Sequence, residues 1–543
     1  MDELTQHGGL YMKKLILFLS LTLLAACSTT ENETSQKKET LRINFQDGDL
    51  PSTHPHIGID FRIRSLQSAL YEGLTRIDPL GNALPAAAEK IDLSPCQTRY
   101  TFTLREASWS NGETVTADQF ANAWIEAIKP GSPCRRPDLF YPIKNAEKAK
   151  KREVPINEVG IRTVDSKTLE ITLEHPTPYF LELIANPIFS PLYDDSEEPT
   201  TFNGPFLIQT WKPEQSIILA KNPLYWDTQE VGLDTIDISI VTDPQTALAL
   251  FEKGELDWIG SPFSSLPNET IPAYLSDGKI QSKEVARIYW LYCNSEAFPF
   301  DNPNIRKALA YAIDRKAIVD HVLLGQFPAT SPLPNSLNLL EDHLLPLNSD
   351  QEKAQFFFQK GLEETGLTEE TFPEITLSHS HIGGQKQLAE VIRSNWTDAL
   401  DLTVHLTGSE WNVYFHDLST GNFQIGGCLK SALFRDPIYH LELLKDKSHA
   451  YNVSRWEDAT YQALLEEAQT KPERRLEALQ AAEEILLDQM PVIPIYSEAY
   501  LYALQPHIEN VVIHDLGHVD FKWIHSHPQG TSCSHLIANH DPD

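Results

Sequence analysis

Apolar and polar positions follow two different periods along the chain. The run TRYTFTL, residues 98–104, places aromatic or aliphatic side chains at every second position, which predicts a half-buried strand. VIPIY, residues 492–496, is a continuous apolar run and predicts a buried strand. TADQFANAWIEAI, residues 116–128, has large apolar residues at four-residue spacing and predicts a helix with Thr116 as its N-cap.

Two later segments, residues 305–323 and 457–469, also have the pattern of amphipathic helices. Short strands and helices alternate from residue 41 onward with no fixed period, which argues against a repeat solenoid. The chain has 543 residues, more than the ~250–300 at which a single core stops growing. The pattern therefore predicts a mixed α/β protein with at least two lobes.

The first 27 residues have the composition of an export signal. Lys13 and Lys14 precede a short apolar run that ends in small residues before Cys27. This run is shorter than the ~20 residues of a membrane-spanning helix. Residues 24–27 resemble the lipobox of bacterial lipoproteins, which implies that Cys27 is acylated and becomes the first mature residue. Met12 is then the expected start, with residues 1–26 as upstream residues and signal peptide.

Residues 27–40 are polar and predict a flexible tether behind the lipid anchor. We therefore expect the globular part to lie outside the cytoplasm at the cell envelope, in the periplasm or on the extracellular face. An ordinary signal peptide with an incidental cysteine is the alternative.

Composition narrows the function further. Hydrophobic residues make up 41% of the chain, as in ordinary globular proteins, and the net charge of −32 argues against nucleic acid as a partner. Five cysteines remain besides Cys27, and none lies in a CxxC pair, so neither a zinc ribbon nor a thioredoxin-like centre is predicted. An odd number leaves at least one unpaired thiol, and a disulfide between Cys96 and Cys134 stays open.

A series of longer motifs occurs in order along the chain. LYEGLTRIDPLGNALPAAAEK, residues 70–90, is followed by YTFTLREASWSNGETVTADQFANAW, residues 100–124. The later motifs are NGPFLIQTWKPEQSIILAKNPLYWD (203–227), FEKGELDW (251–258), FDNPNIRKALAYAIDRKAIVDHVLLGQFPATSPLP (300–334) and LLDQMPVIPIY (486–496). Together they resemble family 5 of the extracellular solute-binding proteins, the oligopeptide- and dipeptide-binding lipoproteins of ABC importers.

This resemblance implies a two-lobed α/β periplasmic-binding-protein fold of class II, of the large peptide-binding type with an extra subdomain in the first lobe. The first lobe would comprise residues 41–287 and 492–525, the second residues 288–491, and residues 526–543 would form a His-rich tail. Ligands would lie between the lobes, which close by hinge motion.

The resemblance also implies function and partners. An oligopeptide would be held largely through its backbone and delivered to permease and ATPase subunits, by a monomeric protein that needs no cofactor. We find no HExxH, GxSxG or other nucleophile arrangement, so an enzyme is not expected.

The expected ligand-binding positions follow from matching motifs to the family. Family members pair the ligand's α-amino group with an aspartate, whose place here falls on Leu433, while common basic positions fall on Leu418 and Gly427. Asp436 becomes the missing carboxylate if the match is shifted by three residues, and Asp49 is another acid at a ligand-facing place. The full set of expected ligand-binding residues is Asp49, Leu50, Gly260, Ser261, Trp411, Gly426, Gly427, Leu433 and Asp436.

These substitutions leave two interpretations of the cargo open. Either another group takes the amine's charge, or the ligand lacks a free amine, as a modified or cell-wall-derived peptide would. Metal or metal-chelate capture is a second alternative, because the tail is rich in borderline ligands. These residues are His525, His527, Cys533, His535 and His540, with His379 and His381 as a further pair that is more typical of exposed polar residues.

Overall fold

The computed structural model describes residues 39–527 except 49, 51, 59 and 195. The predicted signal peptide, Cys27, nearly all of the tether and residues 528–543 therefore lie outside the described residues. In the described part of the chain no helix is long and apolar enough to cross a membrane.

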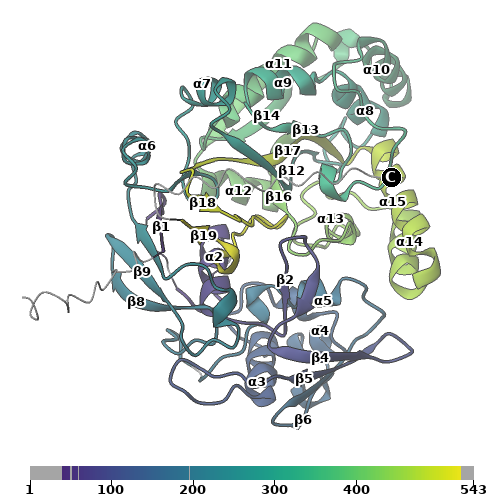
Figure 1. Cartoon of the computed structure of the whole chain (residues 1–543). Helices are drawn as coiled ribbons and strands as arrows, with labels where there is room; N and C mark the ends of the chain where they lie inside the picture. Colours follow the sequence, from purple (N-terminus) through teal and green to yellow (C-terminus); the bar gives the residue numbers. More distant parts are fainter. Residues whose placement is uncertain (1–38, 49, 51, 59, 195, 528–543) are drawn as a thin grey trace, which may run out of the picture. The chain divides into compact units, whose positions relative to one another are not determined.

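Among the described residues the strands form three larger sheets and two short pairs (Figure 1). One four-stranded sheet has the order β1 (Thr40–Asn44), β10 (Thr235–Ser239), β9 (Ser216–Lys221), β8 (Phe206–Lys212). Another has the order β4 (Ala88–Leu93), β5 (Arg99–Leu104), β7 (Thr168–Thr172), β6 (Ile161–Asp165). The short pairs are β2 (Thr75–Ile77) with β3 (Ala83–Pro85) and β18 (Ile508–Glu509) with β19 (His525–Ser526).

The third sheet is mixed and joins segments from distant parts of the chain. Its order is β11 (Trp258–Gly260), β17 (Val492–Leu504), β12 (Gln281–Cys293), β16 (Ile425–Ser431), β14 (Ile375–Ser380), β15 (Val404–Ser409), with β13 (Phe327–Pro328) also pairing with β17. β17 lies between β11 and β12, so a strand from late in the sequence separates two earlier ones.

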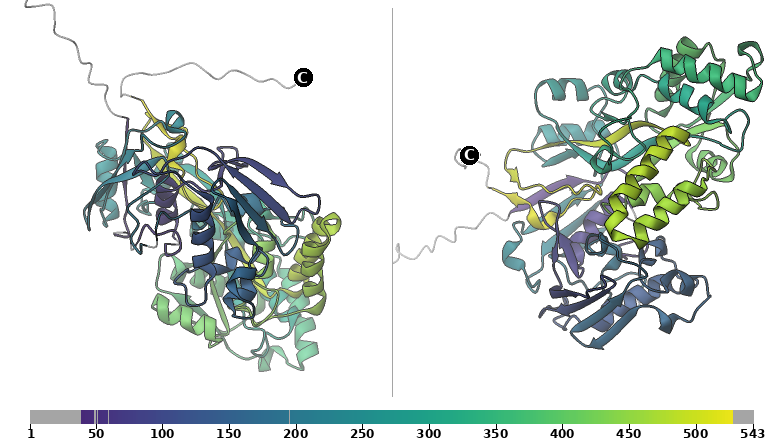
Figure 2. Two further views of the ribbon diagram at one scale, coloured as in Figure 1. Left: turned by 90° about the horizontal axis from the view of Figure 1, so that it is seen from below. Right: turned by 90° about the vertical axis from the view of Figure 1, so that its right-hand side faces the viewer.

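Helices surround these sheets and connect them. They are α2 (Phe61–Leu70), α3 (Ala117–Ile128), α4 (Ala146–Lys150), α5 (Phe180–Leu183), α6 (Pro244–Glu252), α7 (Ile271–Ser276), α8 (Pro303–Tyr311), α9 (Arg315–His321), α10 (Gln351–Thr365), α11 (Gln385–Leu400), α12 (Trp411–Thr420), α13 (Ile438–Glu442), α14 (Ala459–Thr470) and α15 (Arg475–Gln489). The long helices α14 and α15 pack side by side (Figure 2).

Most of the locally predicted elements are confirmed. α3 begins after Thr116, whose backbone N–H donates to Gln119 Oε1 at 2.9 Å. The strand predicted at 98–104 is β5, and the buried run at 492–496 opens β17. The single helix predicted over residues 305–323 is wrong: the chain forms α8 and α9, because Asp314 caps a new helix by accepting from the Ala317 N–H.

Two thirteen-residue strands, β12 and β17, run antiparallel side by side (Figure 1). Their pairing extends from Gln281 opposite Tyr502 to Tyr292 opposite Val492, with an irregularity between Glu284 and Ile288. The lobe boundary expected after residue 287 falls at this irregularity, within a strand and not in a loop.

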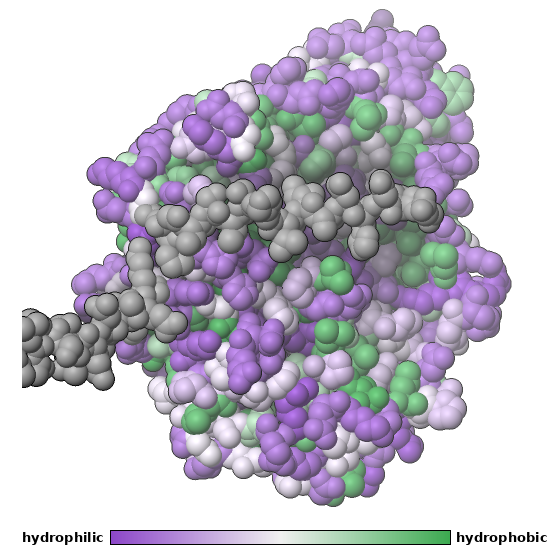
Figure 3. Space-filling view, in the orientation of Figure 1, coloured by the Kyte–Doolittle hydropathy of each residue, from purple (hydrophilic) through white to green (hydrophobic). Residues whose placement is uncertain are grey.

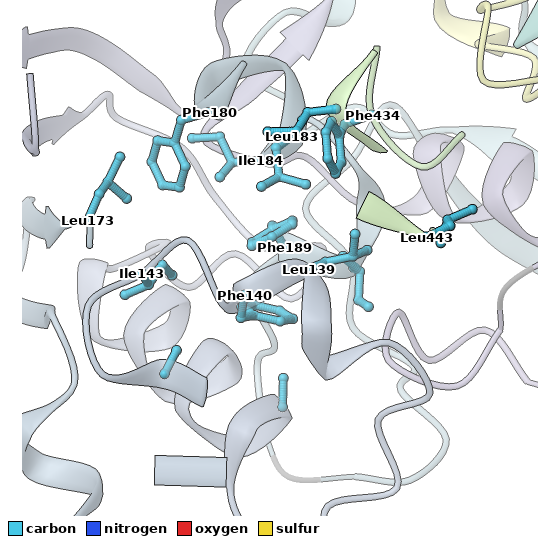
Figure 4. Packing of buried hydrophobic residues seen from close by; sticks show 14 of the residues in the cluster. Leu139, Phe140, Ile143, Leu173, Phe180, Leu183, Ile184, Phe189, Phe434 and Leu443 are labelled. Carbon is cyan, nitrogen blue, oxygen red and sulfur yellow. The ribbon is translucent and has the colours of Figure 1, made fainter. Parts of the chain in front are cut away.

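The apolar core includes a cluster shared by residues 74–189 and residues from the last third of the chain. In Figure 4, Phe434 lies beside Leu183 and Ile184, and Phe434 and Leu443 belong to the same buried cluster as Phe140 and Phe189. The segment after β16 is therefore packed against α5. Outside the core, the face drawn in Figure 3 has many hydrophilic residues with hydrophobic ones scattered among them.

Candidate functional site

A cavity of about 240 Å³ lies where three separate parts of the chain meet. The β2–β3 loop and α5 contribute one part of its wall, β12 and the loop after β16 another, and the segment between β18 and β19 the third. The lining residues are 77–81, Glu182, Lys283, Arg435, 512–516 and His518. The volume is smaller than the ~300–1,000 Å³ that encloses a whole small ligand, so this cavity suits one end of a longer molecule.

The cations of the cavity are already paired with Asp515. Lys283 Nζ donates to one carboxylate oxygen at 2.7 Å, and Arg435 Nε lies 3.0 Å from the other. Asp78 is engaged by its own turn, since it accepts from the backbone N–H groups of Leu80 and Asn82. Asp515 therefore ties β12 and the loop after β16 to the segment between β18 and β19.

Glu182 is the carboxylate of this wall that has a free oxygen. Its Oε2 atom is buried and has no hydrogen-bond partner among the residues that the structure describes. Burial raises the pKa of Glu182, Arg435 opposes the rise, and the charges of Asp436 and Asp515 add to it. A buried acid in this state gains most from a cation that brings both charge and N–H donors.

The loop that carries Leu433 and Asp436 is packed beside Glu182. Asn186, one turn after Glu182, donates to the Leu433 carbonyl at 3.5 Å, and the Phe434 ring stacks on Tyr179 with centroids 4.3 Å apart. Asp436 accepts from Arg475 Nη2 at 2.5 Å and from the Ile438 N–H at the start of α13 at 3.0 Å. Both groups bind the same oxygen, Oδ1, so the charge of Asp436 is already paired with Arg475.

A second charged cluster surrounds Phe61 at the start of α2. The guanidinium carbons of Arg64 and Arg287 lie 4.6 and 4.8 Å from the centre of the Phe61 ring. Arg287 also forms a salt bridge with Glu498, whereas Arg64 forms none with the described residues. A cation–π contact contributes only ~0.5–2 kcal/mol, which is less than the several kcal/mol that an unpaired buried charge costs.

Three expected ligand-binding residues lie in the β11 region or beside it, and none lines the 240 Å³ cavity. Gly260 pairs with Tyr502 and has φ of 101°, and the Ser261 N–H donates to the Leu501 carbonyl at 3.0 Å. Leu50 is buried in an apolar cluster. Asp49 lies outside the described residues. Their role toward a ligand stays a prediction.

The expected ligand-binding residues on α12 and β16 contact other residues of this chain. A Cβ on Gly427 would lie 2.7 Å from the Trp290 carbonyl, and one on Gly426 would lie 2.8 Å from the Leu418 side chain. The bare backbone of β16 therefore admits neighbouring groups of this chain. Trp411 is 37% exposed on α12 and stacks on Phe415.

The side chains that could bind a metal ion do not form a cluster within the described residues. No group of three or more His, Cys, Asp and Glu side chains there is arranged to hold a metal ion. The buried His379 lies next to its own strand neighbour, with Nδ1 3.0 Å from the Ser380 carbonyl, and its ring centre is 6.2 Å from that of His381. His527 is 3.3 Å from Glu509, while Cys533, His535 and His540 lie outside the described residues.

The disulfide that the sequence left open is absent from the described residues, since Cys96 and Cys134 are both free thiols, the first exposed and the second buried.

The residues that sequence reasoning missed are Glu182, Arg64 and Asp515. The signal for Glu182 is a single charge inside an otherwise apolar segment, PYFLELIANPIF. The signal for Arg64 is weaker, because FRIRSL also contains Arg62. A charge at such a place is buried with the segment, and a buried charge needs a partner. Asp515 lies in a polar turn and carries no comparable signal.

A sheet built from distant segments, a charged cavity lined by such segments and buried charged groups without a hydrogen-bond partner among the described residues favour a protein that binds a solute. Residues 82–452 match the family model described as bacterial extracellular solute-binding proteins, family 5 Middle. The chain belongs to this family, so the resemblance found in the sequence motifs is confirmed, as is the α/β binding-protein fold.

Two relatives illustrate the similarity. The chain is 36% identical over 506 residues to the oligopeptide-binding protein OppA of Bacillus subtilis, covering 90% of this chain and 93% of that one. It is 31% identical over 474 residues to the dipeptide-binding protein DppE of the same organism, covering 84% and 86%. Among solved structures, the substrate-binding domain of an oligopeptide ABC transporter from Bacillus anthracis matches with a TM-score of 0.72 and 27% identity, over 90% of this chain and 99% of that one.

Proposed function

We propose that this chain captures oligopeptides between its two lobes and delivers them to the permease of an ABC importer. The names of its relatives support a peptide as the cargo. The proposal includes the expected lobes and closure by hinge motion, and the anchor at Cys27 that would hold the protein at the outer side of the membrane. Recognition through backbone pairing explains how one site accepts varied side chains.

The observation that carries this proposal is the partnerless carboxylate oxygen of Glu182. In the predicted match to the family, Leu433 takes the place of the amine-pairing aspartate, and Asp436, which takes it if the match is shifted by three residues, is paired with Arg475. Glu182 lies near the same loop, because Asn186, three residues after the end of its helix α5, donates to the Leu433 carbonyl and Arg435 acts on the Glu182 charge. Glu182 therefore supplies the negative charge that an α-ammonium group requires.

A modified or cell-wall-derived peptide is the second candidate cargo, because Leu433 removes the usual amine partner. One relative, 25% identical over 464 residues, is named the periplasmic murein peptide-binding protein MppA of Escherichia coli. A metal chelate is a weaker candidate, supported only by the His-rich composition of the tail.

The cargo can be identified directly. Residues 28–543 are purified, the co-purifying ligand is released by mild denaturation, and its mass is determined. We expect a mixture of ordinary peptides of similar length. A single modified peptide would move the assignment to the second candidate, and a protein that neither retains nor binds any peptide would contradict the proposed function.

Replacing Glu182 with glutamine is expected to weaken binding of peptides that have a free α-amine by at least tenfold. The substitution keeps the shape and removes the charge, so N-acetylated peptides should bind the variant and the parent equally. Titration calorimetry with matched free and acetylated tripeptides measures both. Equal losses for the two peptides would show that Glu182 does not contact the amine.

The exposed Glu106, which pairs only with Lys167, provides a matched control. Glu106→Gln removes the same charge outside the cavity. We expect it to leave both affinities unchanged.

A further inference from the structure

Four arginines of the described chain are almost completely buried, and one of them differs from the others. Arg76 is paired with the carboxylates of Glu72 and Asp520. Arg306 and Arg315 donate to backbone carbonyls. Arg64 is 4% exposed, yet its Nε and Nη1 atoms have no hydrogen-bond partner and it forms no salt bridge.

The groups around Arg64 come from several separate elements. Phe61 lies on α2, the helix that also carries Arg64. Arg287 belongs to strand β12 and Tyr500 to strand β17. Tyr439 of α13 and Asp60 also act on its charge. His518, which lines the 240 Å³ cavity, is repelled by the same guanidinium. Arg64 therefore lies near groups of α2, β12, β17 and α13. It does not itself line the 240 Å³ cavity, but its charge acts on His518 in the cavity wall.

The electrostatics of this place favour an anion. Burial is the largest influence on Arg64 and lowers its pKa to about 10; Tyr500 and Asp60 oppose this, and Arg287 adds to it. Asp60 does not neutralise the guanidinium, because its carboxylate caps α2 at the Ile63 N–H and lies 3.5 Å from Arg62. The Tyr500 hydroxyl is also buried, and the guanidinium groups of both Arg64 and Arg287 act on it.

We infer that Arg64 is the residue that receives a carboxylate of the bound peptide, with Arg287 and the Tyr500 hydroxyl beside it. A guanidinium offers several N–H donors in one plane and pairs more strongly with a carboxylate than a neutral donor does. The inference rests on the proposed function, since it assigns the second charged end of the same ligand. It also places a carboxylate receptor at a position other than Leu418 and Gly427, where the family's common basic residues are missing.

A ligand-binding arginine and a purely structural arginine should differ in how their replacement changes the stability of the ligand-free protein. Methionine has a similar length and no charge, so Arg64→Met removes a guanidinium that forms no salt bridge with the described residues and whose Nε and Nη1 atoms have no hydrogen-bond partner among them. Arg315→Met is the matched control, because there the side chain leaves behind the carbonyls of Pro494 and Ala310. We expect the melting temperature of the ligand-free protein to stay equal or rise for Arg64→Met and to fall for Arg315→Met.

The binding test compares three peptides of one sequence with neutral side chains: the free acid, the C-terminal amide, and the amide with one glutamate. We expect Arg64→Met to lose at least tenfold in affinity for the free acid and to bind the simple amide as the parent does. A loss on the glutamate peptide as well would assign a side-chain carboxylate to the same receptor. Inorganic phosphate and chloride, added alone, test whether any anion occupies it.

Each outcome separates the inference from the function on which it rests. If the parent binds none of the peptides, the proposed function fails. If the parent binds acid and amide equally, or if Arg64→Met weakens both equally, peptide capture stands and the carboxylate receptor is refuted. Arg315→Met should leave the preference for acid over amide unchanged among the molecules that remain folded.

Discussion

Replacing Arg76 with methionine is expected to lower the free energy of unfolding by about 3–5 kcal/mol, the cost of leaving a buried partner charge unpaired. Arg76 Nη1 lies 2.7 and 2.6 Å from the two oxygens of Asp520, and Arg76 Nε lies 3.0 Å from Glu72. Tyr225 donates to the other Glu72 oxygen. The substitution leaves two buried carboxylates at once without their cation.

The same network predicts a pH dependence. Burial alone would raise the pKa of Asp520, but the charge of Arg76 outweighs it and holds the pKa well below the ordinary value. The stabilisation is therefore present above the unfolded pKa of ~3.9 and is lost as the pH falls below it. In Arg76→Met the loss of stability at low pH should be smaller, because the ion pair between Arg76 and Asp520 is already absent from the variant.

Urea unfolding at several pH values measures both effects. Arg99→Met is the control, since Arg99 is 60% exposed and lies 3.6 Å from Glu170, and such a pair contributes less than ~1 kcal/mol. Equal stabilities for the two variants at neutral pH would contradict the assignment of Arg76 as the central cation of this network.

The second large effect is expected for Gly260→Ala. Gly260 has φ of 101°, and a Cβ atom there would lie 2.3 Å from the Leu501 carbonyl oxygen. The substitution combines a backbone conformation that costs ~1–3 kcal/mol with displacement of a neighbouring strand, so we expect a loss of about 3 kcal/mol or more.

Gly112→Ala separates the two contributions. Gly112 has φ of 88° and no atom within 4 Å of the position that a Cβ would take, so only the conformational cost applies. Thermal unfolding of both variants gives the difference, which is the contribution of the close approach between β11 and β17. A Gly260→Ala variant as stable as Gly112→Ala would show that β17 shifts without cost.

The sequence predicts best where the determining residues are close together. Thr116 and Gln119 are three residues apart and define the start of α3 by themselves. The break between α8 and α9 was missed because the apolar spacing continues through it. Asp314, which caps α9, is the local signal for this break. The contact that Arg315 next to it makes with the carbonyl of Pro494, 179 residues later in the chain, leaves no local pattern.

The same reason limits prediction of the site. Motif matching identifies the family and places Leu433 in a loop that the structure brings against α5 and Glu182. Which acids are free depends on pairings such as Arg475 with Asp436 and Lys283 with Asp515, between residues 39 and 232 positions apart. The sequence shows which residues are charged, but it does not show which of them form ion pairs in the folded protein.

The position of β17 between β11 and β12 has a consequence for biosynthesis. Both earlier strands are made long before residues 492–504 leave the ribosome, and β12 then has an unpaired backbone edge along a buried strand. A chain that ends before residue 492 cannot complete this sheet, and it keeps an edge that other chains can pair with. We therefore expect truncated products to aggregate or be degraded, so that only chains synthesised almost to the end reach the folded state.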